Sequence, residues 1–146
     1  MAFTGNYICT SFKVELLKGV HNFTPGTGNT FKLALYNQNA TFNAATTAYT
    51  STNEIAASGT YTTGGVALTP YIPTSANTTA YVDFVDLSLT GVTITTFGAL
   101  IYNSSAAGNP AVCVLDFGGQ RTTTPGGVLN IVFPTDDVTS AIIRVF

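Results

Sequence analysis

This 146-residue sequence carries very little charge. Only 8% of its residues are Asp, Glu, Lys or Arg, against roughly 25% in an ordinary soluble domain. The five basic residues form no cluster and the net charge is −2, so a nucleic acid or an anionic membrane finds no complementary patch. The surface must be built from Thr, Ser, Asn and Gly, which suits an assembly component or an uncharged polar coat.

The residue types that carry most metal sites and hydrolytic triads are also scarce. The chain has one histidine, His21, and two cysteines, Cys9 and Cys113, in no CxxC pair. These are too few for the usual zinc sites. We interpret His21 as a residue that satisfies the last carbonyls of a helix. We interpret both cysteines as buried reduced thiols, with a disulfide between them as the less favoured alternative.

Long apolar runs are absent as well. No segment approaches the roughly 20 apolar residues that cross a bilayer. The first residues, MAFTGNYICTSF, lack the basic and apolar regions of a secretory signal. We therefore expect synthesis in a cytoplasm and no membrane partner.

The most informative stretch runs from Phe97 to Gly118. Two apolar runs, 100–102 and 111–115, flank a polar turn that contains Asn, Ser, Gly and Pro. Uninterrupted apolar runs bounded by turn residues predict strands that are buried on both faces. We expect this hairpin to be the centre of the core.

One segment, 11–21, has helical periodicity. Ser11 is the predicted N-cap and Gly19 the predicted stop. The expected buried stripe has helical spacing and consists of Phe12, Leu16, Leu17 and Val20.

Short strands separated by turn signals fill the rest of the chain. We expect 31–36 to alternate with one wet face, 81–89 to carry a bulge or lie at an edge near Asp83 and Asp86, and 119–127 to be a turn cluster. Further strands are expected at 66–68, 92–96, 128–133 and 141–146, and a long loop at 37–59. The pattern predicts an all-β fold, mainly an antiparallel β-sandwich or jelly-roll-like domain over 1–146, with one short N-terminal helix and a possible extended arm at 1–10.

The spacing of the carboxylates and tyrosines matches no known metal-binding, catalytic or sugar-binding motif. The aspartates are chemically suited to calcium but lack EF-hand spacing, so turn formation is the favoured interpretation for Asp83, Asp86, Asp116, Asp136 and Asp137. A glycosidase needs two opposed carboxylates, and nothing in the sequence pairs them. Six tyrosines are compatible with a sugar-stacking surface, although packing at sheet margins is the more usual role: Tyr36, Tyr49, Tyr61, Tyr71, Tyr81 and Tyr102. We predict no enzyme site, no metal and no cofactor.

Several segments carry a family resemblance. They are SFKVELLKGVHNF at 11–23, NTFKLALYNQNATFNAATTAYTSTNEI at 29–55, GTYTTGG at 59–65, GALIYNSS at 98–105, AVCVLDFG at 111–118 and FPTDDVTSAIIRV at 133–145. Together they resemble a group of small structural proteins of tailed bacteriophages and prophages. The chain departs from that pattern near Leu89, where relatives tend to have an aromatic residue, and near Phe97, where they tend to have a basic one.

The resemblance implies a virion structural protein with no enzyme activity. The expected type is a capsid decoration (cement) protein on the head surface, a homo-oligomer with a trimer favoured, whose partner is the major capsid protein. The alternatives are a tail or neck structural protein, or a receptor- or glycan-binding module of a fibre. Partner contacts are expected from the N-terminal segment and the 37–59 loop, at Phe3, Tyr7, Ile8, Phe42, Tyr49 and Asn53.

Overall fold

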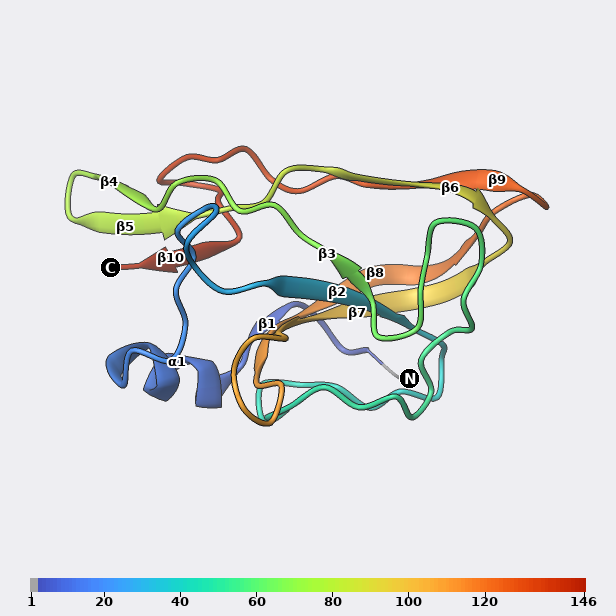
Figure 1. The fold of residues 1–146 in the computed structure, drawn as a ribbon, viewed down its shortest axis with the longest axis horizontal. Helices are drawn as coiled ribbons and strands as arrows, with labels where there is room; N and C mark the ends of the chain where they lie inside the picture. Colours follow the sequence, from blue (N-terminus) through green and yellow to red (C-terminus); the bar gives the residue numbers. More distant parts are fainter. Residues whose placement is uncertain (1–2) are drawn as a thin grey trace.

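The computed structural model describes residues 3–146, which form ten strands and one short helix (Figure 1). The elements are β1 (Tyr7–Ile8), α1 (Thr10–Leu17), β2 (Phe31–Tyr36), β3 (Val66–Ala67), β4 (Thr74–Ala76), β5 (Thr79–Val82), β6 (Leu87–Val92), β7 (Thr95–Asn103), β8 (Ala111–Thr122), β9 (Gly127–Ile131) and β10 (Ile143–Val145). All pairings between these strands are antiparallel. The predicted all-β class with a single short helix is confirmed.

The predicted hairpin forms the centre of the largest sheet. Its strands, β7 and β8, lie within the order β1-β8-β7-β2-β3. Leu100 pairs with Val114 and Ile101 pairs with Cys113. All four side chains are buried, because each face of this part of the sheet is covered by other segments of the chain.

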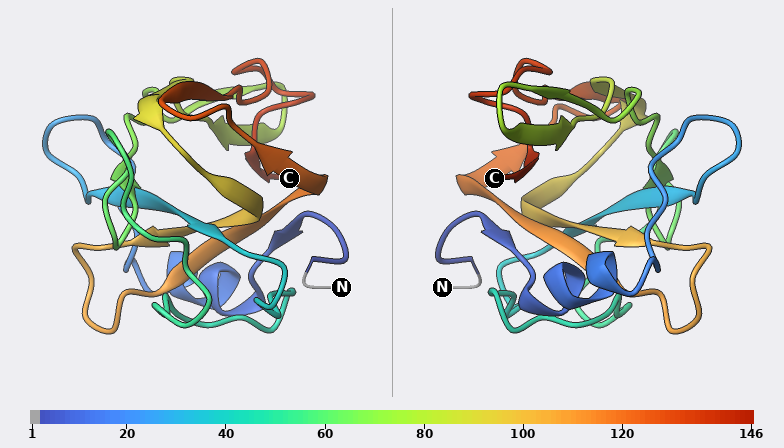
Figure 2. Two further views of the ribbon diagram at one scale, coloured as in Figure 1. Left: turned by 90° about the vertical axis from the view of Figure 1, so that its right-hand side faces the viewer. Right: turned by 90° about the vertical axis from the view of Figure 1, so that its left-hand side faces the viewer.

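Two smaller sheets form a second layer over the first (Figures 1 and 2). Their orders are β10-β5-β4 and β6-β9. Because β6 leads into β7 and β8 leads into β9, a two-stranded ribbon bends from one layer to the other. At the bend, Thr123 Oγ1 accepts from the N–H of Ile94 at 3.0 Å and donates to the carbonyl of Val92 at 2.9 Å. The hydroxyl thus forms hydrogen bonds with an N–H and a carbonyl at the bend, where regular strand pairing is interrupted.

The opposite face of the five-stranded sheet is covered by α1 and the 37–59 segment (Figures 1 and 2). The strand expected at 31–36 forms as β2, but its expected wet face is wrong, since every residue except the half-buried Lys32 is buried. Phe42 packs edge-on against Tyr36, with ring centroids 4.6 Å apart. Alternation along a strand does not reveal that a distant polar-looking loop will cover its second face.

The helix differs from its prediction at its start and along its apolar stripe. Cys9, not Ser11, occupies the N-cap position, and no side chain caps the helix there. The predicted stripe forms only in part: Phe12 is buried and the half-buried Leu16 packs against the core, whereas Leu17 is 91% exposed. Gly19 does stop the helix, in the left-handed region at φ +71°, where glycine is favoured.

In two other segments the strands begin and end at residues other than those predicted from the sequence. The strand expected at 81–89 is split between sheets, since β5 ends at Val82 and β6 begins at Leu87. The turn cluster expected at 119–127 is shorter than predicted, because β8 continues to Thr122 and β9 begins at Gly127, which leaves the turn at 123–126. Within β8, residues 117–120 bulge out between the pairs formed by Asp116 and Arg121.

Both cysteines are buried and free, as predicted. No helix of the described residues is long and apolar enough to cross a bilayer.

Candidate functional site

His21 lies in the core with both ring nitrogens occupied. Its Nε2 donates to Glu15 Oε2 at 2.7 Å, and its Nδ1 accepts from Asn103 Nδ2 at 3.1 Å. The Asn103 amide is oriented by its own Oδ1, which accepts the backbone N–H groups of Ser105 and Ala106. These contacts place the proton between the ring and Glu15 on Nε2.

The predicted role of His21 as a cap for helix carbonyls is therefore wrong. Its acidic partner, Glu15, lies six residues earlier, and the sequence offered no signal that the chain would turn back on itself after Leu17. No hydroxyl or thiol of the described residues is hydrogen-bonded to the ring. Burial followed by the charge of Glu15 raises the pKa of Cys9 to about 11, and burial also raises the pKa of Cys113. Both thiols therefore stay protonated at neutral pH, which makes them poor nucleophiles.

Glu54 gathers three donors inside the 37–65 segment. Its Oε1 accepts the Tyr61 hydroxyl and the N–H of Gly64, each at 2.7 Å. Its Oε2 accepts the Tyr49 hydroxyl at 2.6 Å. Burial raises the pKa of both tyrosines, and Glu54 raises it further, so the phenols remain protonated donors. Because the Tyr61 hydroxyl also accepts from the N–H of Leu35 at 2.9 Å, this cluster fastens the segment to β2.

Most of the six tyrosines cannot stack on a sugar, because their rings are covered by other residues. Tyr36, Tyr61 and Tyr102 are buried. The ring of Tyr49 stacks on that of Tyr102 with centroids 4.5 Å apart. Only Tyr71 among the six tyrosines considered is substantially exposed, so these rings serve packing and loop attachment.

Three aspartates considered for calcium approach one another near the second layer. Burial raises the pKa of Asp83, and the nearby charges of Asp136 and Asp86 raise it further. Yet Asp83 already accepts the N–H groups of Phe84 and Ile142. Among the described residues, no group of three or more acidic, His or Cys side chains is arranged to hold a metal ion.

The remaining two aspartates form local turns. Asp116 Oδ1 accepts the N–H of Gly118 at 2.8 Å, and Asp137 Oδ1 accepts the N–H of Thr139 at 2.7 Å. Hydrogen bonds from Thr139 and Ser140 lower the pKa of Asp137 to about 2. For these two residues the structure agrees with the predicted turn-forming role.

The N-terminal residues expected to contact a partner pack against the largest sheet. Phe3 is buried. Tyr7 and Ile8 are half-buried in β1, opposite Val114 and Cys113 of β8. The expected arm at 1–10 is therefore packed over its described part, while residues 1–2 lie outside the described residues.

The expected contacts in the 37–59 segment are also engaged within the chain. Phe42 is buried, with its ring centroid 6.0 Å from that of Phe3. Tyr49 is held by Glu54, and Asn53 Nδ2 donates to the carbonyl of Asn39 at 3.1 Å. Partner contact by the six residues stays a prediction, and the burial of Phe3 and Phe42 indicates that these two support a surface instead of forming it.

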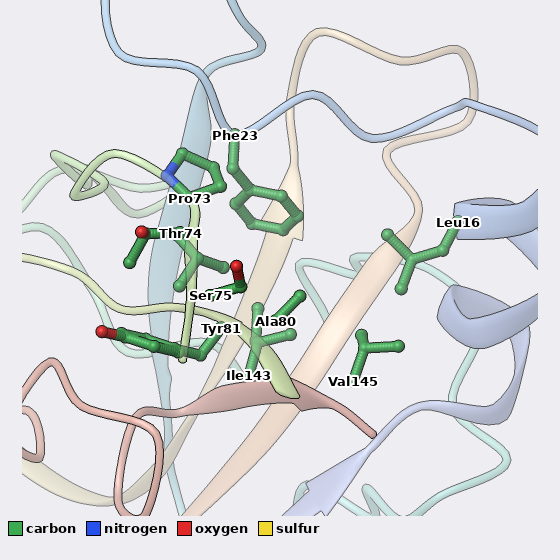
Figure 3. A pocket seen from close by; sticks show the side chains of 10 residues that line it. Leu16, Phe23, Pro73, Thr74, Ser75, Ala80, Tyr81, Ile143 and Val145 are labelled. Atoms are coloured by element: carbon green, nitrogen blue, oxygen red, sulfur yellow. The ribbon is translucent and has the colours of Figure 1, made fainter. Parts of the chain in front are cut away.

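A different, apolar surface lies where α1 faces β10. A groove of about 550 Å³ separates α1 from the β4-β5-β10 sheet, and Figure 3 shows Leu16 on one side of it and Ile143 and Val145 on β10. A second groove of about 560 Å³ continues past β10 to Leu17 and Phe146. We call these five residues the helix–strand face. Because Leu17 is 91% and Phe146 is 87% exposed, this face is suited to binding another apolar surface.

Cationic side chains border the second groove. Lys13 and Arg144 line it, and none of its lining residues is acidic. The guanidinium of Arg144 lies over the Phe146 ring, 5.6 Å from its centroid. The helix–strand face is thus apolar at its centre and positive at its margin, although the chain as a whole is slightly negative.

Comparisons with known proteins leave the function to be argued from the chain itself. No family model matches the chain, and neither a curated protein nor a solved structure is significantly similar to it.

Proposed function

We propose that this chain is a structural protein of a tailed-bacteriophage virion: a capsid decoration protein that binds the outside of the head and stabilises contacts between major capsid subunits. The observation that carries the proposal is the helix–strand face. Apolar side chains as exposed as Leu17 and Phe146 are characteristic of surfaces that a partner protein covers. The sequence resemblance to small phage structural proteins supplies the identity of that partner.

Binding through this face needs no chemistry beyond burial and charge. Covering the apolar centre releases water from Leu17 and Val145, which are exposed in the free chain. Lys13 and Arg144 at the margin favour a partner with acidic groups around its own apolar patch. A trimer would present three copies of the face together, so that individually weak contacts become strong through avidity.

The copy number in purified particles tests the functional class. Quantitative mass spectrometry of virions from the phage or prophage that encodes the chain should find copies comparable in number to the major capsid protein. Far fewer copies would favour the alternative, a tail or neck protein. Complete absence from particles would overturn the assignment to the virion.

Paired variants test the face itself. Leu17→Asp places a charge in the centre of the face, which should reduce incorporation strongly because the carboxylate must be desolvated on binding. Val132→Asp is the matched control, since Val132 is 74% exposed and lies outside the face. Both variants should melt near the wild-type temperature, because neither side chain supports the core. Normal incorporation of Leu17→Asp would show that the contact lies elsewhere.

Point variants are preferable to removing the N-terminal segment. A deletion of residues 1–10 would take away β1 and the buried Cys9. Loss of binding after such a deletion could therefore reflect damage to the largest sheet instead of a lost contact.

A further inference from the structure

A second depression differs in character from the helix–strand face. It is a cleft of about 540 Å³ between the turn that follows β2 and the bulge in β8. Two aromatic residues, Phe3 and Phe97, line it together with the polar residues Gln38, Asn39 and Asp116. The volume lies within the range of roughly 300–1,000 Å³ that is usual for small-ligand sites.

The bulge in β8 shapes one wall of this cleft. Arg121 Nη2 donates to the carbonyl of Phe117 at 2.6 Å, and Asp116 Oδ1 accepts the N–H of Gly118 at 2.8 Å. Gly118 and Gly119 have φ of +70° and +133°, a backbone region that other residues rarely adopt. Within the part of the chain that the structure describes, a Cβ atom on either glycine would meet no neighbour within 4 Å. The glycines are therefore required by the backbone of the bulge, and they leave this wall without side chains.

The polar groups of the cleft have unused hydrogen-bonding capacity. Gln38 and Asn39 are exposed, and their side-chain amides bind no other group of the described residues. Asp116 uses Oδ1 for the bulge, and no donor of the described residues binds its Oδ2. Each amide can both donate and accept, whereas the carboxylate accepts only. Together they match a ligand that carries several hydroxyl groups.

We propose that this cleft binds a neutral carbohydrate. The half-buried ring of Phe97 offers a flat apolar surface to the C–H face of a sugar ring, while Gln38, Asn39 and Asp116 bind its hydroxyl groups. Among the described residues, no Lys or Arg lines the cleft, and Asp116 would repel an acidic sugar. This activity goes beyond attachment to a capsid and uses a different surface of the molecule.

A glycan array probed with the intact chain tests the proposal, followed by calorimetric titration of the best neutral oligosaccharide. The decisive variant is Gln38→Ala with Asn39→Ala, because neither amide side chain holds the fold together. Asn130→Ala, on the exposed surface of β9, is the matched control. We expect the double variant to weaken binding by about tenfold or more, which corresponds to the loss of one or two good hydrogen bonds. The control should bind as the wild type does.

Phe97→Ala gives a second readout through the apolar part of the cleft, and it should also weaken binding. Asp116→Asn keeps an oxygen that can accept the Gly118 N–H, so the bulge should stay intact. A change in ligand binding by this variant would therefore report on contact with the ligand and not on damage to the bulge. The proposal is overturned if the array shows no saturable neutral ligand, if only anionic glycans bind, or if the double variant binds like the control. None of these outcomes alters the copy number in particles, so this proposal can fail while the virion assignment stands.

Discussion

The 37–59 segment and the helix–strand face both differ from what their amino-acid sequences suggest. Residues 37–59 are rich in Thr, Asn and Ala, yet the segment is fastened by Glu54 and covers the sheet with Phe42. The helix carries apolar residues at helical spacing, yet Leu17 is almost fully exposed. The contrast teaches that a few well-placed contacts decide burial, and that the apolar side chains left outside deserve a functional explanation.

The largest effect should come from Phe42. Phe42→Ala removes a buried ring that packs on Tyr36 and Phe3, so we expect the free energy of unfolding to fall by about 3–5 kcal/mol. Urea unfolding would measure it. If the free energy of unfolding fell by less than about 1 kcal/mol, the ring would not be packed in the core. Phe42 would then be available for direct contact with a partner.

Glu54 should come next. Glu54→Ala leaves the hydroxyls of Tyr49 and Tyr61 and the N–H of Gly64 without their acceptor, which should cost about 2–3 kcal/mol for this half-buried group. Glu54→Gln retains one carbonyl acceptor and should cost less. Phenol titration adds an independent test, because the pKa of Tyr49 should fall in both variants once the negative charge is gone. An unchanged titration would contradict the cluster.

Asp83, which accepts the N–H of Ile142 just before β10, gives a pH-dependent test. Its pKa in the folded protein is raised above the usual 3.8, chiefly by burial. The folded state therefore binds this proton more tightly than the unfolded state. Its stabilising contribution is complete below about pH 3.8 and is lost as the pH rises through the raised value.

Asp83→Asn should consequently flatten the decline in stability as the pH rises from about 4 toward neutrality. The variant also loses one acceptor for the N–H groups of Phe84 and Ile142, so its absolute stability is less informative than the slope. Urea midpoints across this pH range measure the slope. An identical slope in variant and wild type would show that Asp83 does not titrate with folding.

The smallest effect should be seen at Leu17. Leu17→Ala removes side-chain atoms that are 91% exposed, so the free energy of unfolding should change by no more than about 0.5 kcal/mol. Thermal unfolding of the isolated chain measures this. A loss comparable to that of Phe42→Ala would mean that α1 is packed more deeply in solution, which would remove the basis for the helix–strand face.

Predictions from sequence succeeded where local pattern and tertiary environment coincide. The apolar runs at 100–102 and 111–115 form the paired, buried strands of the central hairpin, because any fold must bury such runs. Gly19 stops the helix for a purely local reason, its left-handed backbone. Predictions failed where a distant segment intervened, as when Phe42 of the 37–59 segment covered Tyr36 on the second face of β2.

The candidate surfaces were less accessible to sequence reasoning than the fold. The polar cleft joins the segment after β2 to a bulge in β8, and these are nearly eighty positions apart in the chain. Paired glycines such as Gly118 and Gly119 are a local sign of irregular backbone, but the sequence pattern predicted a turn cluster at 119–127 and not a bulge within β8. Nothing local showed that Gln38 and Asn39 would face it.

The amino-acid sequence alone determined the all-β class, the central hairpin and the reduced cysteines, because these follow from apolar runs, turn residues and composition. Only the tertiary structure decided which apolar side chains remain exposed to solvent. It also decided that Glu54 accepts the tyrosine hydroxyls and that Glu15 is the hydrogen-bond partner of His21. These outcomes depend on contacts between residues far apart in the chain, such as Asn103 with His21. Such contacts arise when the layers pack, and no periodicity within a single segment encodes them.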